Sequence, residues 1–417
     1  MRINADRLHE SLRQLAQIGA TPGGGVTRLA LSREDRAARD LFRRWLDEAR
    51  LQVRIDDFGN MTGRRRGAES GGAVVIASHL DSVRRGGRFD GAYGVMGALE
   101  VMRTLNDLGI TTRRPLEIVN WTNEEGVRFE PAMLASGAVA GRFTPDYVYG
   151  RTDREGKRFG DELERIGYKG DKRNRPGPAA AYLELHIEQG PVLEDANIPV
   201  GIVEGIVGIT WSEVTAEGHA DHAGPSPMTL RRDALVAAAR LIAGVDELAR
   251  SVPGAVGTVG RIAAEPNIIN TIPGRVTVSV DLRHPERETL ERLFGELERL
   301  VREIGTATGV SFGLNRFWTS EPTPFARDVV DAVQGAADEM GIPTQRVWSG
   351  AGHDAKYMQD VTPSAMIFVR SINGLSHCEQ EYSAPEDLEA GVNVLLRAAL
   401  RLAGVASERT THHRGKG

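Results

Sequence analysis

Four short, mostly apolar segments in this sequence each lead into a histidine or an acidic residue. The runs occupy 73–78, 116–121, 182–185 and 365–370. The polar residues that follow them are His79, the pair Glu124 and Glu125, His186 and His377. The run 73–78 is wholly apolar, as is typical of a strand buried on both faces of a parallel sheet. The carboxyl ends of such strands border one crevice. The sequence therefore predicts an α/β domain in which these polar side chains gather at one edge of the sheet.

Helical periodicity separates the apolar runs and supports the same fold class. Apolar residues recur at helical spacing over 33–50, after a Ser32 that can cap the helix, and again over 94–108. A third helix is expected from about 385 to 402, after the last apolar run. Strand, loop, helix and strand in this order form the repeating unit of α/β sheets.

The segment 209–322 has a different rhythm and is expected to be a separate domain. We expect its strands at 209–216, 256–263, 275–283 and 310–318, and its helices at 230–249 and 286–305. This β-α-β-β-α-β order is that of a ferredoxin-like α+β domain. The predicted architecture is thus a mixed-sheet α/β domain, 1–208 with 323–417, interrupted by an inserted domain, 209–322.

Composition excludes several classes of function. The 417 residues carry a formal net charge of −5, which argues against a nucleic-acid-binding protein. No apolar run approaches the roughly 20 residues needed to span a bilayer, and the N-terminus lacks the apolar core of a secretory signal. The one cysteine, Cys378, allows no internal disulfide, so a cytoplasmic protein is expected. The tail 407–417 is expected to be disordered.

The residues at the strand ends are suited to metal binding. A single histidine at a strand end is most often structural, and adjacent glutamates are usually a solvated turn. Five such positions, with Asp90 in a glycine-rich loop after the first run, are unlikely to coincide by chance. Imidazole and carboxylate together suit zinc and related divalent metals. Five ligands exceed one tetrahedral site but fit two ions bridged by one carboxylate, and a second glutamate then remains to act as a general base.

Seven motifs in this order resemble one known family. They are SHLDSV, the loop around Asp90, TNEEGVRF, LHIEQGPVLE, HAGPSPM, SGAGHDA and GLSHCEQE, and they span roughly residues 75 to 385. The sequence is similar to the N-carbamoyl-L-amino-acid hydrolases, with the β-ureidopropionases and allantoate amidohydrolases. These enzymes form a branch of the dinuclear-zinc aminoacylase and carboxypeptidase superfamily.

The resemblance implies a role for each residue of the metal site. One ion would be held by His79 and His186, and the other by Glu125 and His377. Asp90 would bridge the two ions, which would be zinc first, with manganese, cobalt or nickel as substitutes. The general base would be Glu124, and the aspartate that orients the imidazole of His79 would be Asp81.

The resemblance also implies a substrate site and a dimer. The residues that match substrate-contacting positions are Gln189, His222, Asn270, Arg283 and Gly352. His222 would polarise the scissile carbonyl from the opposite subunit of a homodimer that forms through the inserted domain. Asn270 and Arg283 would hold the substrate carboxylate, for which the planar fork of arginine is well suited. Gly352 would contribute a backbone donor.

Other polar residues near the motifs have structural interpretations. His219 is expected to be structural, because the motif favours His222. His353 and Asp354 are expected to organise their loop, with a contact to substrate as an alternative. Cys378 adjoins His377 and is expected to be a small packing residue rather than a ligand.

The activity implied is hydrolysis of the carbamoyl C–N bond of N-carbamoyl-L-amino acids to the amino acid, carbon dioxide and ammonia. A β-ureidopropionase or an allantoate amidohydrolase is the alternative within the family. An N-acyl-amino-acid hydrolase or peptidase is disfavoured by Gln189, Asn270 and Arg283. An inactive dimeric binding protein is disfavoured because every metal position and the base are filled.

Overall fold

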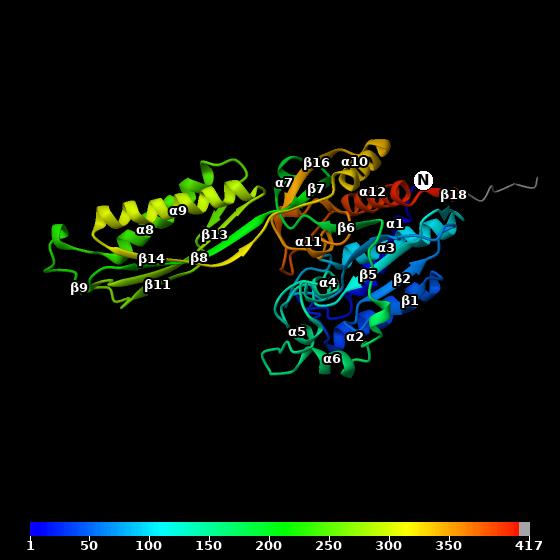
Figure 1. The fold of residues 1–417 in the computed structure, drawn as a ribbon, viewed down its shortest axis with the longest axis horizontal. Coiled ribbons are helices and arrows are strands. Elements are labelled where there is room, and N and C mark those ends of the chain that lie inside the picture. The colour runs from blue at the N-terminus through cyan, green and yellow to red at the C-terminus, as the bar shows by residue number, and fades with distance from the viewer. Residues whose placement is uncertain (408–417) are drawn as a thin grey trace, which may run out of the picture. The chain divides into compact units, whose positions relative to one another are not determined.

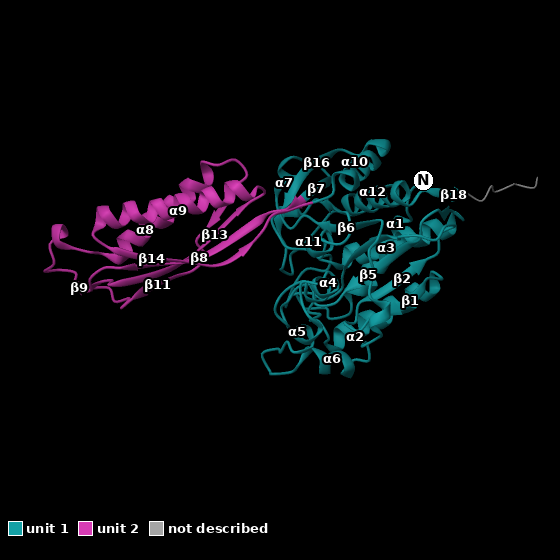
Figure 2. Ribbon diagram, viewed as in Figure 1, with its two compact units in different colours: residues 1–204, 325–417 teal, residues 205–324 magenta. Residues whose placement is uncertain are grey.

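The structure is a computed structural model that describes residues 1–407, and it divides the chain into two compact units. Unit 1 comprises 1–204 and the chain from 325 onward, and unit 2 comprises 205–324 (Figure 2). The boundaries expected from the sequence, 209 and 322, fall a few residues inside unit 2. Most of the predicted tail, 408–417, lies outside the described residues.

The larger sheet has nine strands within the described residues. They are β1 Gln52–Ile55, β2 Met61–Arg65, β3 Val74–His79, β5 Leu116–Trp121, β6 Ala181–Ile187, β7 Val200–Ile206, β15 Thr323–Pro324, β16 Thr344–Ser349 and β17 Ser364–Val369. The order is β1-β2-β5-β3-β6-β17-β7-β15, and β16 also pairs with β7. The four central strands β5, β3, β6 and β17 are mutually parallel, whereas β2 and β7 pair antiparallel on either side of them. The mixed α/β sheet expected from the sequence is confirmed.

Helices cover this sheet, and their main members begin where the sequence predicts. The helices of unit 1 are α1 Ala5–Ala16, α2 Arg33–Glu48, α3 Ala92–Asp107, α4 Leu134–Val139, α5 Pro145–Tyr149, α6 Phe159–Arg165, α7 Val192–Asp195, α10 Arg327–Met340, α11 Ala355–Met358 and α12 Pro385–Ala403. Ser32 caps α2 by accepting the backbone N–H of Asp35. The α3 helix packs on β3 and β6 and against α12 (Figure 1), and most of its side chains are buried. A short strand pair, β4 Thr111–Thr112 with β18 Val405–Ser407, completes this unit.

Unit 2 is a two-layer α+β sandwich of one sheet and two helices. The sheet strands are β8 Gly208–Glu217, β10 Val256–Thr258, β11 Ile262–Glu265, β13 Arg275–His284 and β14 Ser311–Ser320, and the helices are α8 Ala234–Arg250 and α9 Arg287–Thr308. The antiparallel order β10-β13-β8-β14 places the first and third strands of the motif side by side. Side chains alternate along β8 and β13, with one face buried against α8 and α9 and the other open.

One expected strand of unit 2 is wrong in detail. The segment expected as a single strand, 256–263, is divided into β10 and β11, and both parts pair with β13. Between them the carbonyl of Arg261 accepts the backbone N–H of Ser279, but the N–H of Arg261 donates to the Oγ of Ser279 rather than to a backbone carbonyl. Gly257 and Gly260 supply no Cβ to pack on this stretch, which favours an interruption there. A further small ladder joins β9 Asp221–His222 to β12 Thr271–Ile272.

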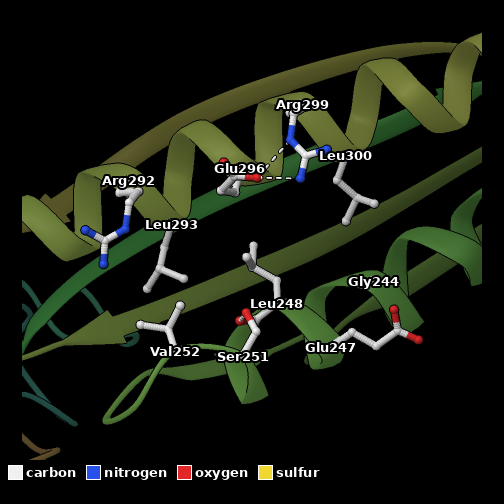
Figure 3. A pocket seen from close by; sticks show the side chains of 10 residues that line it. All are labelled: Gly244, Glu247, Leu248, Ser251, Val252, Arg292, Leu293, Glu296, Arg299 and Leu300. Atoms are coloured by element: carbon white, nitrogen blue, oxygen red, sulfur yellow. Dashed lines mark hydrogen bonds and ion pairs between the residues drawn. The ribbon is translucent and has the colours of Figure 1, made fainter.

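No helix within residues 1–407 is both long and apolar enough to cross a membrane. A cavity of about 450 Å³ lies between α8 and α9, lined by leucines and by charged side chains such as Glu296 and Arg299 (Figure 3). None of the candidate site residues lines it.

Candidate metal centre

The four parallel strands deliver their polar residues to the same edge of the sheet. His79 is the last residue of β3, and His186 is the second-last residue of β6. The acidic pair Glu124 and Glu125 follows β5, and His377 follows β17. Because β5, β3, β6 and β17 are adjacent and parallel, their carboxyl ends lie side by side.

Two clusters of ligand atoms form at this edge. One contains His79, Asp90 and His186, and the other contains Asp90, Glu125 and His377. In each cluster the ligand atoms all lie within 4.8 Å of one another. The structure thus brings together all five residues predicted to bind metal.

Asp90 belongs to both clusters through different oxygens. Its Oδ1 lies 3.1 Å from Nε2 of His186 and 3.8 Å from Nε2 of His79. Its Oδ2 lies 3.3 Å from Nε2 of His377, which is itself 3.5 Å from Oε2 of Glu125. One carboxylate that offers one oxygen to each group is the arrangement expected of a bridging ligand.

Backbone carbonyls orient two of the imidazoles. Nδ1 of His79 lies 3.0 Å from the carbonyl oxygen of Asp81, and Nδ1 of His186 lies 2.9 Å from that of Ile187. An Nδ1–H that donates to a carbonyl leaves the lone pair on Nε2, the atom that points into the cluster. Both rings are therefore held in the tautomer and orientation that a metal ligand needs.

Asp81 acts through a different atom from the one expected. Its backbone carbonyl, not its carboxylate, contacts His79. The carboxylate accepts the backbone N–H of Glu124 through Oδ1 and that of Glu125 through Oδ2, each at 3.2 Å. The side chain is fully buried, so its two bonds fix the loop that carries the acidic pair.

The general-base candidate lies beside the first cluster. Oε2 of Glu124 is 3.5 Å from Nε2 of His79, and the residue is 7% exposed. Burial, followed by the nearby carboxylates of Asp354 and Glu125, raises the pKa of Glu124 well above its ordinary value. Burial also lowers the pKa of His79 to about 4, so that ring is neutral.

The donor set fits a pair of cations. The buried carboxylates of Asp81, Asp90 and Glu124, with that of Glu125, whose side chain is 5% exposed, surround a site whose imidazoles include a neutral one. Buried carboxylates are costly unless they are paired or coordinate metals. Mixed imidazole and carboxylate ligands match zinc and its neighbours in the first transition row.

Glu381 was not predicted, and it fixes the bridging aspartate. Its Oε1 accepts the backbone N–H groups of Phe89 and Asp90, each at 3.1 Å, and its Oε2 accepts the hydroxyl of Ser376. The loop that carries Asp90 can approach the ring of His79 closely because residue 91 is glycine. Its φ is +62°, and a Cβ added at this position would lie 2.3 Å from His79. The GLSHCEQE motif carries this glutamate, and its position four residues after His377 is the signal that could have found it.

A second missed residue is Glu184, inside β6. It shares a face of the strand with His186 and is fully buried, and it accepts from the hydroxyl of Tyr182 and from the backbone N–H of Ala355. Burial raises its pKa to about 7. A glutamate inside the apolar run LELHI is the signal for it, because strands buried on both faces seldom carry a charge without a partner.

Gln189 lies at the rim of the second cluster. Its Nε2 donates to Oδ2 of Asp90 at 3.2 Å and to the hydroxyl of Ser376 at 3.1 Å. Its Oε1 is buried and has no hydrogen-bond partner among residues 1–407. Its backbone φ is +59° and that of His377 is +55°, so both are held in the left-handed region that non-glycine residues seldom adopt.

The loop between β16 and α11 contains His353 and Asp354 as buried residues. The ring of His353 lies 4.6 Å from that of His186, and its Nε2 contacts the hydroxyl of Ser349. Asp354 accepts the hydroxyl of Ser136. The neighbouring Gly352 is exposed, and a Cβ added at this position would contact the side chain of Met133. Cys378 is partly buried and belongs to neither ligand cluster.

The remaining predicted substrate residues belong to unit 2. His222 and Asn270 are exposed and lie together, because β9 pairs with β12 and the backbone N–H of Ala223 donates to the carbonyl of Asn270. Arg283 lies at the other end of the unit 2 sheet. In the pairing of β13 with β8, Arg283 lies opposite Ile209. Arg275, which is next to the β9–β12 ladder, lies opposite Glu217 at the other end of β8.

Comparison with known proteins finds a peptidase family and amidohydrolase relatives. Residues 75–401 match the profile of the peptidase family M20/M25/M40. The chain is 43% identical to the N-carbamoyl-L-amino-acid amidohydrolase of Rhizobium meliloti, over 97% of this chain and 98% of the relative. It is 35% identical to the allantoate amidohydrolase of Bacillus subtilis, over 93% and 95%.

Solved structures agree with the sequence relatives. An amidase of the hydantoinase/carbamoylase family from Burkholderia multivorans superposes with a TM-score of 0.94 at 47% identity. The match covers 96% of this chain and 98% of that one.

Proposed function

The chain belongs to the peptidase family M20/M25/M40, and from that membership we propose that it is a metal-dependent amidohydrolase that cleaves the carbamoyl C–N bond of N-carbamoyl-L-amino acids. The products are the amino acid, carbon dioxide and ammonia. The observation that carries the proposal is the double cluster that shares Asp90, with Glu124 beside it. Relatives at 36–43% identity that are named for this activity set the substrate class.

We assign two divalent cations per chain to the double cluster, with Zn²⁺ first and Mn²⁺, Co²⁺ and Ni²⁺ as substitutes. His79 and His186 would hold one, Glu125 and His377 the other, and Asp90 both. When bound, such a pair supplies Lewis-acid activation of water and of the substrate carbonyl. The residues then divide the remaining work among themselves.

Glu124 is the proposed proton carrier. Its carboxylate takes the proton of the attacking water and later delivers it to the leaving amine. Asp81 holds the backbone of Glu124 and Glu125 in place through its two oxygens. The unpartnered Oε1 of Gln189 is suited to accept an N–H of the ureido group.

His222 is the proposed donor to the developing oxyanion. Its Nδ1 accepts the backbone N–H of Gly224 at 3.0 Å, so the proton of the neutral ring lies on Nε2. An Nε2–H is the group that can donate to a carbonyl oxygen as negative charge develops there.

The geometry of unit 2 supports a substrate site shared by two chains. Arg283 lies eight residues along β13 from Arg275, which is about 26 Å in an extended strand. His222 and Asn270 lie near the Arg275 end, because β9 follows Glu217, the partner of Arg275, and β12 precedes Arg275 in the chain. One small substrate cannot contact both ends of a sheet in the same chain. We therefore propose that Arg283 holds the substrate carboxylate while His222 and Asn270 come from the second chain of a homodimer formed through unit 2.

Gly352 remains the proposed backbone donor to the substrate, and the cytoplasm remains the proposed location, since the one cysteine can form no internal disulfide. The test of the function is ammonia release from a panel of N-carbamoyl-L-α-amino acids, β-ureidopropionate and allantoate. Fastest turnover of an N-carbamoyl-L-amino acid supports the proposal. Preference for allantoate or β-ureidopropionate would replace it with the activity of another branch, and no turnover of any of them by metal-loaded protein would refute it.

A further inference from the structure

Arg283 is already bound by a neighbour on its own strand. Its Nε donates to Oδ1 of Asp281 at 3.0 Å, and its Nη2 donates to Oδ2 at 2.7 Å. Residues two apart on a strand share a face, so both side chains lie on the open face of the unit 2 sheet. This is a side-on bidentate pair, and it fixes the plane of the guanidinium.

The carboxylate of Asp281 is itself held from the next strand. Trp211 lies directly across from Asp281 in the β8–β13 register, and its Nε1 donates to Oδ2 at 2.9 Å. The indole of Trp211 packs on that of Trp318 with ring centroids 4.5 Å apart. Three strands thus contribute to one chain of contacts that ends at the guanidinium of Arg283.

Stability does not account for this arrangement. The side chains of Arg283 and Asp281 are 29% and 25% exposed, and ion pairs open to solvent contribute little to folding. The two hydrogen bonds to Asp281 restrict where the guanidinium points, because a long arginine side chain has many rotamers.

We propose that Asp281 is a positioning residue for substrate-carboxylate recognition, fixing the plane of the Arg283 guanidinium that meets the substrate, while Trp211 holds Asp281. The inference rests on the proposed role of Arg283 in the amidohydrolase reaction. It adds that the strength of carboxylate recognition depends on two residues that do not touch the substrate.

The experiment compares two substrates that differ only in the group Arg283 would bind. One is the N-carbamoyl-L-amino acid that the wild type accepts best, and the other is its neutral carboxamide. Asp281→Asn is expected to raise KM for the acid about tenfold with little change in kcat, and to leave kcat/KM for the carboxamide unchanged. Trp211→Phe keeps the ring on Trp318 but removes the N–H, so it is expected to cause a smaller change of the same kind.

A matched control and a double-mutant cycle complete the design. Glu213→Gln changes an exposed acid on the same face of β8 and is expected to change neither substrate's kinetics. In an Arg283→Lys background, which loses the planar fork, Asp281→Asn is expected to have almost no further effect on kcat/KM for the acid. The cycle is decisive even where turnover of the carboxamide is too slow to measure.

Three outcomes would overturn the inference while leaving the amidohydrolase activity intact. They are equal losses on both substrates, additive losses in the cycle, and a lower KM for the acid in Asp281→Asn, which would mean that Asp281 competes with the substrate. Failure of the proposed function is distinct, since the wild type would then turn over neither substrate.

Discussion

The carboxylate of Asp81 accepts the backbone N–H of Glu124 at 3.2 Å, so the loop that carries the general-base candidate is held by a buried side chain from the neighbouring strand end. Asp81→Asn retains one acceptor oxygen but turns an amide N–H₂ toward the N–H of Glu124 or Glu125. We expect kcat to fall about 10- to 100-fold with retention of the fold. Steady-state kinetics and the circular dichroism spectrum measure both, and unchanged kcat would show that the loop holds its position without Asp81.

Removal of metal should abolish turnover. Dialysis against a chelator is expected to give inactive protein, and addition of Zn²⁺, Mn²⁺ or Co²⁺ is expected to restore activity. Calorimetric titration of the apo-protein should show two ions per chain, and one for His377→Ala, because that change removes a ligand of the second cluster alone. Full activity in protein shown to be free of metal would contradict the assignment.

The two adjacent glutamates should differ in what they lose. Glu124→Gln is expected to keep both ions and to lose kcat by about 10²- to 10⁴-fold, because it removes proton transfer. Glu125→Gln is expected to lose one ion, since Oε2 of Glu125 belongs to the second cluster. Metal content and kcat are measured for both variants, and equal metal loss in the two would refute this division.

Subunit mixing tests the shared substrate site. Glu124→Gln and His222→Ala are each expected to be nearly inactive as homodimers. A heterodimer of the two has one site with an intact Glu124 from one chain and an intact His222 from the other, so activity should reappear. The same recovery is expected with Asn270→Ala in place of His222→Ala, but not when Asn270→Ala is mixed with His222→Ala. No recovery in dimers proven to have exchanged subunits would mean that His222 acts within its own chain.

The buried ion pair of α2 should matter for stability. The side chains of Arg39 and Asp35 are fully buried, and Arg39 also donates to the carbonyl of Gly59 and to the hydroxyl of Thr122. Arg39→Ala leaves a buried carboxylate unpaired and should lower the free energy of unfolding by about 3–5 kcal/mol. Arg36→Ala, on the exposed side of the same helix, should cost about 0–1 kcal/mol. Denaturant titration compares them, and equal losses would contradict the argument.

Much of the larger sheet could be predicted from the sequence because its central strands are short and mostly apolar. The strand predicted at 116–121 is β5 residue for residue, and those at 73–78 and 365–370 are displaced by only one residue. The strand predicted at 182–185 was too short, because it ended before His186, which lies inside β6 and is buried. A polar residue paired inside a core cannot be told from an exposed one by hydropathy alone.

The ligand set could also be predicted, but the atoms that support it could not. The types of side chain at strand ends are visible in the sequence. Backbone geometry, which is not visible there, decides that the carbonyl of Asp81 contacts His79 while its carboxylate accepts the N–H of Glu124. The role of Glu381 could not be predicted either, because the backbone N–H groups of Phe89 and Asp90 that it accepts lie almost 300 residues away along the chain.

The position of β17 constrains the order in which the protein can be assembled. This strand lies between β6 and β7 in the sheet, yet it follows both of them in the sequence by more than 150 residues. All of unit 2 is synthesised before β17 emerges from the ribosome, so until then β6 and β7 each present an unpaired edge. His377 follows the end of β17 by eight residues. The step that closes the sheet therefore also delivers the last of the proposed metal ligands, and a nascent chain can become a hydrolase only once its main sheet is whole.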